Sequence, residues 1–336
     1  MRHLSLKASL VFLGLMACKP DVGAPPSLIQ GPTILAIRGE PAEAKQGAVV
    51  SYEALVVDPN GRMAVPEAPV KTGVTWATCD QPKPPIENNS VSVKCLDLDA
   101  LPGVPGPTPS TFKAPIPDEA CATFGPTPPP SEPGEPPIRA RDQDVTGGYY
   151  VPIRASVVVP ETQRRPGMAT EDSIISFTHQ RVSCGIAKVG QGPYLEYIAN
   201  YKLNTNPKIA GLKLSLDGTE LLDIPAKQAG VAPIAIKPGS EITLYAGWTV
   251  ESRETYPAYD VIDRDLKYHP ESLRVSWFAT GGEFKHDVTG RGEEETEFFA
   301  ENTWKANTEG LIHLWIVLHD SRGGTDFESY ELEVIP

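Results

Sequence analysis

The sequence predicts an all-β protein made of two β-sandwich domains. Short runs in which apolar and polar residues alternate are separated by glycine and proline, which number 29 and 35 among the 336 residues. Short strands with turn signals between them are typical of antiparallel sandwiches. No amphipathic stretch of about 12 residues or more predicts a helix. The length suggests about two domains.

The first 17 residues have the features of a cleaved secretory signal. Arg2 and Lys7 precede a short apolar stretch that ends in Leu15-Met16-Ala17-Cys18. The stretch is shorter than the roughly 20 residues that span a bilayer. The last four residues resemble the bacterial lipobox, in which the cysteine becomes the first mature residue and is acylated. An ordinary secretory signal that happens to precede a cysteine is the alternative.

The resemblance implies a covalent diacylglycerol and further acyl chains, such as palmitate, on Cys18. Two or three chains anchor a protein stably, whereas one chain binds only weakly. Lys19 stands where an aspartate often marks retention at the inner membrane. We therefore expect a lipid-anchored protein of the cell envelope, in the outer membrane of a Gram-negative bacterium. Residues 18–32, rich in small residues and proline, would be the lipidated tether.

The first predicted domain covers residues 33–185. Strands are expected at 33–38, 48–58 and 74–79, with a turn at Asp58-Pro59-Asn60-Gly61. Residues 81–145 are dense in proline and glycine, which predicts a long insertion without central strands. Alternation resumes at 148–159 and 172–183. The first domain is thus expected to be a sandwich with a proline-rich insertion.

A linker at 186–204 leads to a second predicted domain at 205–336. Its expected strands are 209–216, 241–250, 272–280, 295–304, 312–319 and 327–334. The two halves repeat one pattern, a turn glycine and a strand followed by Val74-Thr75-Trp76 or by Val275-Ser276-Trp277. A tryptophan on the third strand, buried between the sheets, is typical of immunoglobulin-like folds.

The second half carries further motifs of this kind. Trp277-Phe278-Ala279-Thr280-Gly281-Gly282 is followed by Thr303-Trp304, and a long apolar strand then leads to Asp320-Ser321-Arg322-Gly323-Gly324. The order resembles a bacterial Ig-like or PKD-like module over residues 205–336. The resemblance implies immunoglobulin-like sandwiches used for adhesion, spacing or binding, and it transfers no active site.

Charge and cysteines narrow the class of partner. The net charge of −13 argues against nucleic acid, which requires clustered Lys and Arg. In an exported chain, Cys79, Cys95, Cys121 and Cys184 predict two disulfides, and three pairings are possible. We favour Cys95–Cys121 across the insertion and Cys79–Cys184 in the domain core. All four cysteines belong to the first domain.

One acidic segment is the strongest candidate for ligand binding. It contains Tyr256, Tyr259, Asp260, Asp263 and Asp265. A solvated loop is favoured; three aspartates in a loop could instead hold Ca²⁺, and the tyrosines could stack on sugars. His313 and His319 lie six residues apart on one predicted strand and therefore share a face, where a metal pair is conceivable. No metal-ligand, nucleophile-elbow, P-loop or dinucleotide motif is present.

These observations predict a non-enzymatic envelope protein without a cofactor. Its partners would be the membrane, through the lipid anchor, and an envelope protein or a glycan. An alternative is a structural accessory subunit of an envelope or outer-membrane assembly. An unrecognised hydrolase fits less well, because no local sequence pattern singles out a catalytic residue.

Overall fold

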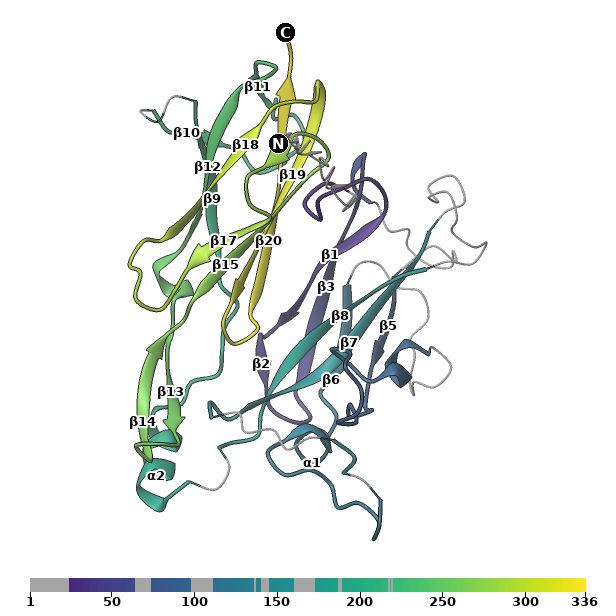
Figure 1. The fold of residues 1–336 in the computed structure, drawn as a ribbon, viewed down its shortest axis with the longest axis vertical. Helices are drawn as coiled ribbons and strands as arrows, with labels where there is room; N and C mark the ends of the chain where they lie inside the picture. The colour runs from purple at the N-terminus through teal and green to yellow at the C-terminus, as the bar shows by residue number, and fades with distance from the viewer. Residues whose placement is uncertain are drawn as a thin grey trace, which may run out of the picture.

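The computed structural model describes residues 24–63, 74–97, 111–135, 137–139, 145–159, 173–186, 189–216, 218 and 220–336. These residues form two β-sandwiches joined by a short helical segment (Figure 1). The predicted all-β fold is confirmed. Cys18 and the predicted signal lie outside the described residues. Among the described helices, none has the length and apolar character needed to cross a membrane.

The first sandwich has two sheets. One contains β1 (Thr33–Glu40), β3 (Val49–Asp58), β4 (Gly61–Arg62) and β6 (Thr111–Pro115). The other contains β2 (Glu43–Ala44), β5 (Val74–Thr78), β7 (Gly148–Val158) and β8 (Ser173–Ser183). Their inward side chains, Tyr52 and Trp76 among them, form one apolar core.

Strand β6 corrects the prediction for residues 81–145. The insertion was expected to lack strands that belong to the sandwich, yet β6 pairs with β3 and completes its sheet. The Phe112 ring stacks on Trp76, with ring centroids 5.8 Å apart. Within the described residues β6 pairs on one side only, and an edge position tolerates Pro115, which has no N–H to donate. The 3₁₀ helix η1 (Val93–Leu96) and the helix α1 (Ala120–Phe124) flank it.

The second sandwich also has two sheets. One contains β9 (Ile209–Ser215), β10 (Leu222–Ile224), β12 (Glu241–Trp248), β16 (Glu283–Phe284) and β18 (Phe299–Lys305). The other contains β11 (Ile234–Ile236), β15 (Leu273–Ala279), β17 (Val288–Arg291), β19 (Gly310–Asp320) and β20 (Thr325–Val334). Trp277 and Trp304 lie fully buried in the core between them.

A linker helix, a 3₁₀ helix and a hairpin lie beside the second sandwich. Helix α2 (Gln191–Asn200) forms in the predicted linker. The 3₁₀ helix η3 (Val250–Ser252) leads into a hairpin of β13 (Thr255–Asp260) and β14 (Asp265–Pro270). Figure 1 shows this hairpin beside α2 at one end of the molecule.

The two sandwiches share one topology. The order β1-β3-β6 matches β9-β12-β18, and the order β2-β8-β7-β5 matches β11-β20-β19-β15. In each, a short strand pairs in parallel with the last long strand, as β2 does with β8 and β11 with β20. This places the immunoglobulin strands A, B and E in one sheet and G, F and C in the other. Trp76 and Trp277 both lie on strand C with no exposed surface, which confirms the predicted repeat.

Candidate functional site

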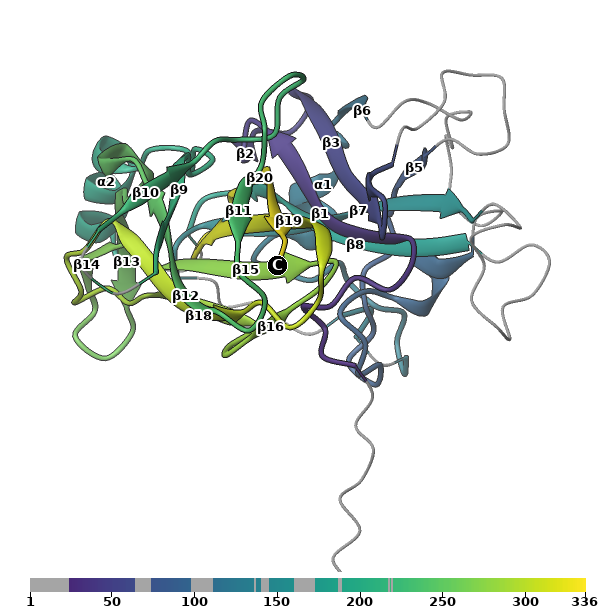
Figure 2. The same ribbon diagram turned by 90° about the horizontal axis from the view of Figure 1, so that it is seen from above.

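The two sandwiches meet through an apolar interface between their outer faces. Leu55 and Val57 of β3 share a buried cluster with Trp315 and Val317 of β19 and with Phe327 of β20. Figure 2 shows β1 and β3 on one side of this contact and β19 and β20 on the other. The sheets are therefore stacked in four successive layers. We take this junction between the sandwiches, with the buried contacts described below, as the candidate functional site.

The sequence indicates this interface through continuous apolar runs, and not through an alternation of apolar and polar residues. A strand buried on both faces has a nearly continuous apolar run instead of an alternating one. Residues 311–318 form such a run. Ile312 and Leu314 point into the core of the second sandwich, while Trp315 and Val317 point to the first. Residues 54–57 of β3 are buried on both faces in the same way.

The segment before β1 also belongs to the junction. The backbone N–H of Ile29 donates to Ala279 O, and Ala279 N–H donates to Ser27 O, both at 2.9 Å. Ile29 is buried in the interface cluster. The predicted tether of residues 18–32 is therefore wrong over residues 27–32, because an apolar side chain there is seated between the sandwiches.

A buried ion pair ties the first sandwich to the linker. Arg181 Nε on β8 lies 3.1 Å from Glu43 Oε2 on β2. Arg181 Nη1 also donates to the Tyr150 hydroxyl at 3.0 Å. The carboxylate of Glu43 accepts from the backbone N–H of Asn204 at 2.9 Å and from the Tyr201 hydroxyl. The residues that follow α2 are thus held by charge-assisted hydrogen bonds.

A second buried network continues into the other sandwich. The Asn204 side chain donates to Asp320 Oδ2 at 3.1 Å. Arg322 donates to Glu271 and to Glu254, at 2.7 Å each. Burial, together with the nearby charge of Asp320, raises the pKa of Glu271 to about 8. Glu271 therefore retains its proton at neutral pH.

Asn204 connects the two networks, since its backbone contacts Glu43 and its side chain contacts Asp320. Most of the donors and acceptors in these two networks bond to other protein groups. Such an arrangement is suited to fixing the orientation of the two sandwiches. Sequence reasoning missed these residues because they are isolated charges within strands and loops. Their only signal is a charge beside apolar neighbours, as at Arg181 before Val182.

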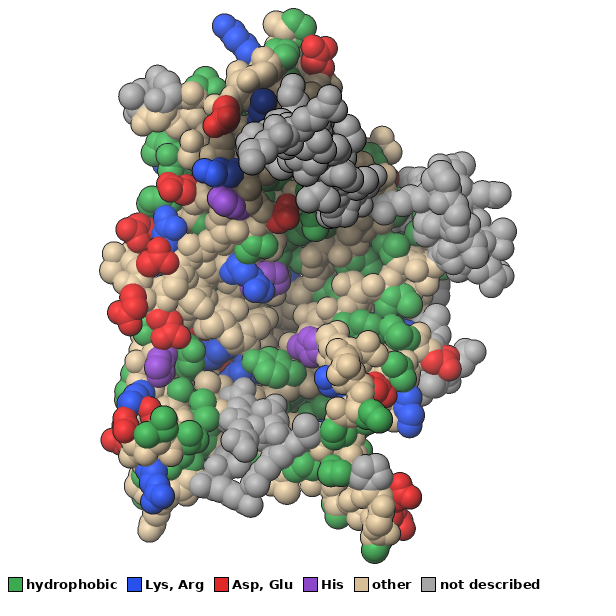
Figure 3. Space-filling model, viewed as in Figure 1, with side chains coloured by type: hydrophobic (Ala, Val, Ile, Leu, Met, Phe, Trp, Pro, Cys, Tyr) green, Lys and Arg blue, Asp and Glu red, His purple; other side chains and the backbone are tan. Residues whose placement is uncertain are grey.

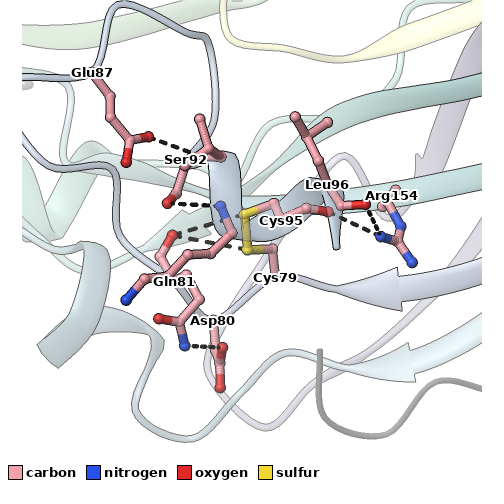
Figure 4. Close-up of a disulfide and its surroundings, with 10 residues drawn as sticks. Cys79, Asp80, Gln81, Glu87, Ser92, Cys95, Leu96 and Arg154 are labelled. Atoms are coloured by element: carbon pink, nitrogen blue, oxygen red, sulfur yellow. Dashed lines mark hydrogen bonds between the residues drawn. A yellow bond between two sulfur atoms is a disulfide. The ribbon is translucent and has the colours of Figure 1, made fainter. Parts of the chain in front are cut away.

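The two predicted disulfides are present, and both lie in the first domain, but the favoured pairing is wrong. The structure joins Cys79 to Cys95 and Cys121 to Cys184. Helix η1 folds back onto the end of β5 and brings Cys95 to Cys79 (Figure 4). Helix α1 packs beside β7 and β8, so Cys121 meets Cys184 just after β8.

Arg154 on β7 holds η1 in this position. Its Nη1 donates to the backbone carbonyls of Cys95 at 3.0 Å and Leu96 at 3.2 Å (Figure 4). The side chain is fully buried, and burial lowers its pKa. The first disulfide and Arg154 therefore pin the start of the proline-rich region to the sheet.

The acidic segment is a hairpin and not a loop. Lys267 Nζ lies 2.5 Å from a carboxylate oxygen of Asp260 and equally close to one of Asp263. Asp265 accepts from the backbone N–H of Leu266 at 2.9 Å. The lysine thus occupies the position between two aspartates that a cation would need. Across the described ranges, no three or more His, Cys, Asp or Glu residues are grouped so as to hold a metal ion.

The two tyrosines of that segment do not form a sugar platform. Tyr256 is buried beneath the Arg322 guanidinium, which lies 4.7 Å from its ring centroid. Tyr259 packs against the apolar cluster around Tyr197 of α2. The structure therefore keeps Asp260 and Asp263 together on Lys267 but places Tyr256 and Tyr259 in different surroundings, because residues of β13 an odd number of positions apart point to opposite faces.

His313 and His319 lie on the outer face of β19, but each has its own partner. His313 Nδ1 is 3.0 Å from Glu331, and His319 Nδ1 is 3.0 Å from Thr325 Oγ1. Burial and the charge of Arg274 lower the pKa of His319 to about 4. This imidazole is therefore neutral at physiological pH.

Charged side chains are distributed unevenly over the surface. Figure 3 shows acidic side chains along the outer edge of the second sandwich and basic and histidine side chains nearer the hollow between the lobes. One hollow at the junction has a volume of about 600 Å³ and is lined by Arg38, Glu40, Asn206 and Asp326 among others. Arg38 there bridges Glu53 of the first sandwich and Asp326 of the second. The ion pairs of Arg38 therefore link the two sandwiches.

Comparison with known proteins shows no relative in sequence: no family model and no curated protein matches. Fibronectin(III)-like modules of Clostridium thermocellum CbhA are 13% identical, with a TM-score of 0.23, over 89% of this chain and 94% of theirs. Dimeric latent PorU from Porphyromonas gingivalis is 10% identical, with a TM-score of 0.21, over 92% of this chain and 24% of that one. Both TM-scores are low and identify no function. The described strands themselves make this an all-β protein of immunoglobulin-like sandwiches.

Proposed function

We propose that this chain is a non-enzymatic, lipid-anchored envelope protein whose two sandwiches act as one rigid body for binding, adhesion or spacing. The observation that carries the proposal is the junction. An apolar cluster, a buried Arg181–Glu43 pair and the Arg322 network all connect the sandwiches or their linker. Domains that move freely have smaller and more polar contacts.

The fixed segment before β1 limits how far the body could stand from a membrane. Ser27 is held on Ala279 at the junction. An extended chain from Cys18 to Ser27 spans at most about 30 Å. If Cys18 carries the lipid, Ser27 lies within about 30 Å of the bilayer surface. The protein would then act as a compact spacer and not as a long stalk.

Replacement of the lipidation residue tests the anchor. We expect Cys18→Ala to move the protein from the membrane fraction to the soluble fraction and to abolish incorporation of labelled palmitate. Lys19→Ala is the matched control, and it should remain lipidated. A Cys18→Ala protein that stays in the membrane fraction would refute the lipid anchor.

An accessory subunit of an envelope assembly is the second candidate. Leu195 and Ile198 on α2 are each 57% exposed, and Ile262 at the hairpin tip is 86% exposed. Figure 1 places both elements at one end of the molecule. Exposed apolar side chains gathered in one region mark contact surfaces.

Cross-linking in intact cells of the producing organism tests this second candidate. A single envelope protein attached at fixed stoichiometry, and lost from Leu195→Ser/Ile198→Ser, would support it. Scattered neighbours that do not change in the variant would count against it.

A further inference from the structure

The outer face of the second sandwich, away from the first, contains an aromatic groove. Its volume is about 540 Å³, within the range of about 300–1,000 Å³ usual for small-ligand sites. Figure 2 shows β9 and β12 on the side of the second sandwich away from β1 and β3. The groove is therefore separate from the junction.

The floor of the groove is formed by two glycines. Gly211 of β9 stands directly opposite Gly247 of β12, and Gly247 stands opposite Phe299 of β18. Both glycines line the groove. Strand interiors disfavour glycine, and its presence often marks the close approach of another molecule. Because neither glycine has a side chain, the pair leaves a gap among the side chains that cover the outer face of this sheet.

Aromatic rings and an aliphatic side chain form the walls. Phe298 is 41% exposed, and Leu221 beyond β9 is 53% exposed. Tyr245 and Phe299 meet with ring centroids 5.7 Å apart. Lys213 and Asp223, 3.5 Å apart, lie at the end of the groove beside Tyr245. The groove thus combines ring surface with a few polar groups.

Trp248 closes the groove from below but offers it little surface. It is only 3% exposed and belongs to the core cluster of the second sandwich. The polar groups that a ligand in the groove could reach are therefore those of Lys213 and Asp223, whose side chains are 50% and 82% exposed. Between them they offer an ammonium donor and a carboxylate acceptor.

We propose that this groove binds a neutral saccharide. A pyranose has an apolar C–H face that suits the negative face of an aromatic ring, and its hydroxyls can both donate and accept. An added β-strand beside β12 is disfavoured, because β12 is already paired on both sides, with β9 and with β18. The net charge of −13 disfavours a polyanion. The inference deepens the proposed display role by naming what is bound.

Gly247→Val provides the sharpest test. The φ angle of Gly247 is not in the left-handed region, and an added Cβ would meet nothing closer than 3.8 Å. Valine suits a strand, so the variant should fold while its side chain fills the floor. Phe298→Ala removes an exposed wall ring. Thr243→Val, on the same face of β12 but outside the groove, is the matched control.

The experiment titrates the full chain with cellohexaose, chitohexaose, laminarihexaose and maltohexaose by calorimetry and saturation-transfer NMR. We expect at least one sugar to bind, Gly247→Val and Phe298→Ala to weaken that binding about tenfold or more, and Thr243→Val to leave it unchanged. Absence of binding by all four sugars, or equal binding by Gly247→Val, would overturn the inference. A protein that fails this test but keeps its membrane anchor would leave the proposed function standing.

Discussion

Arg181 and Glu43 form an ion pair whose side chains are only 1% and 0% exposed. Removing two charges from water costs several kcal/mol per ion, and the pair offsets this only with good geometry and further hydrogen bonds. Tyr150 and Asn204 supply such bonds. The pair is therefore sensitive to the loss of either partner.

Arg181→Met should lower the free energy of unfolding by about 3–5 kcal/mol, because it leaves the Glu43 carboxylate buried without its cation. Glu43→Gln/Arg181→Met should cost less than the sum of the two single changes by about 0.5–3 kcal/mol. Urea denaturation of the three variants measures both values. Additive costs would show that the two residues do not interact.

Trp277→Ala should cost about 3–5 kcal/mol, because the ring is fully buried in the core of the second sandwich. Its Nε1 also donates to Thr289 Oγ1 at 2.9 Å. Chemical denaturation measures the loss. A change below about 1 kcal/mol would contradict the assignment of this tryptophan to strand C of the core.

The two disulfides should contribute unequally. Cys79–Cys95 spans 16 residues and Cys121–Cys184 spans 63. Loop-closure entropy predicts losses of about 3 and about 4 kcal/mol when each pair is replaced by serine. Denaturation of the two double-serine variants tests the order, and peptide mapping without reduction tests the pairing. A peptide that links Cys95 to Cys121 would contradict the structure.

Stability should fall as the pH rises from about 6.5 to about 8. The folded pKa of Glu271 is about 8, above its unfolded value of about 4.5. Its contribution is therefore complete below about pH 4.5 and is lost as the pH rises through about 8. His319 acts in the opposite sense, because its pKa is lowered to about 4, and it adds no slope above about pH 6.5.

In this window the wild-type protein should lose about 2 kcal/mol, at about 1.4 kcal/mol per pH unit. Glu271→Gln keeps the shape of the side chain and should lose much less. Thermal and urea unfolding at several pH values compare the two proteins. Equal slopes would mean that Glu271 is ionised in the folded state.

Alternation, together with the long apolar run at 311–318, was sufficient to predict the long strands. In β12, Ile242, Leu244 and Ala246 point inward, and the strand begins where predicted. The proline-rich region concealed β6, because proline argues against central strands but not against edge strands. The hairpin of β13 and β14 was missed because its short strands flank an acidic turn that predicts a loop.

The junction could be predicted only in part. The continuous apolar run at 311–318 predicts a strand buried on both faces, but it does not say which surface covers it. The contacts of Asn204 with Glu43 and Asp320 join residues far apart in the chain. The cysteine pairing likewise depended on where η1 and α1 fold back, which local patterns do not determine.

The rigid junction is the central claim, and a distance measurement between the sandwiches tests it most directly. Lys113 on β6 and Glu301 on β18 are exposed positions for spin labels. The labels would be attached through Lys113→Cys and Glu301→Cys, in a Cys18→Ser background that keeps both disulfides. Pulsed electron resonance should give one narrow distance distribution, and Trp315→Ala should broaden it. A broad or multiple distribution in the protein with Trp315 intact would contradict the rigid body.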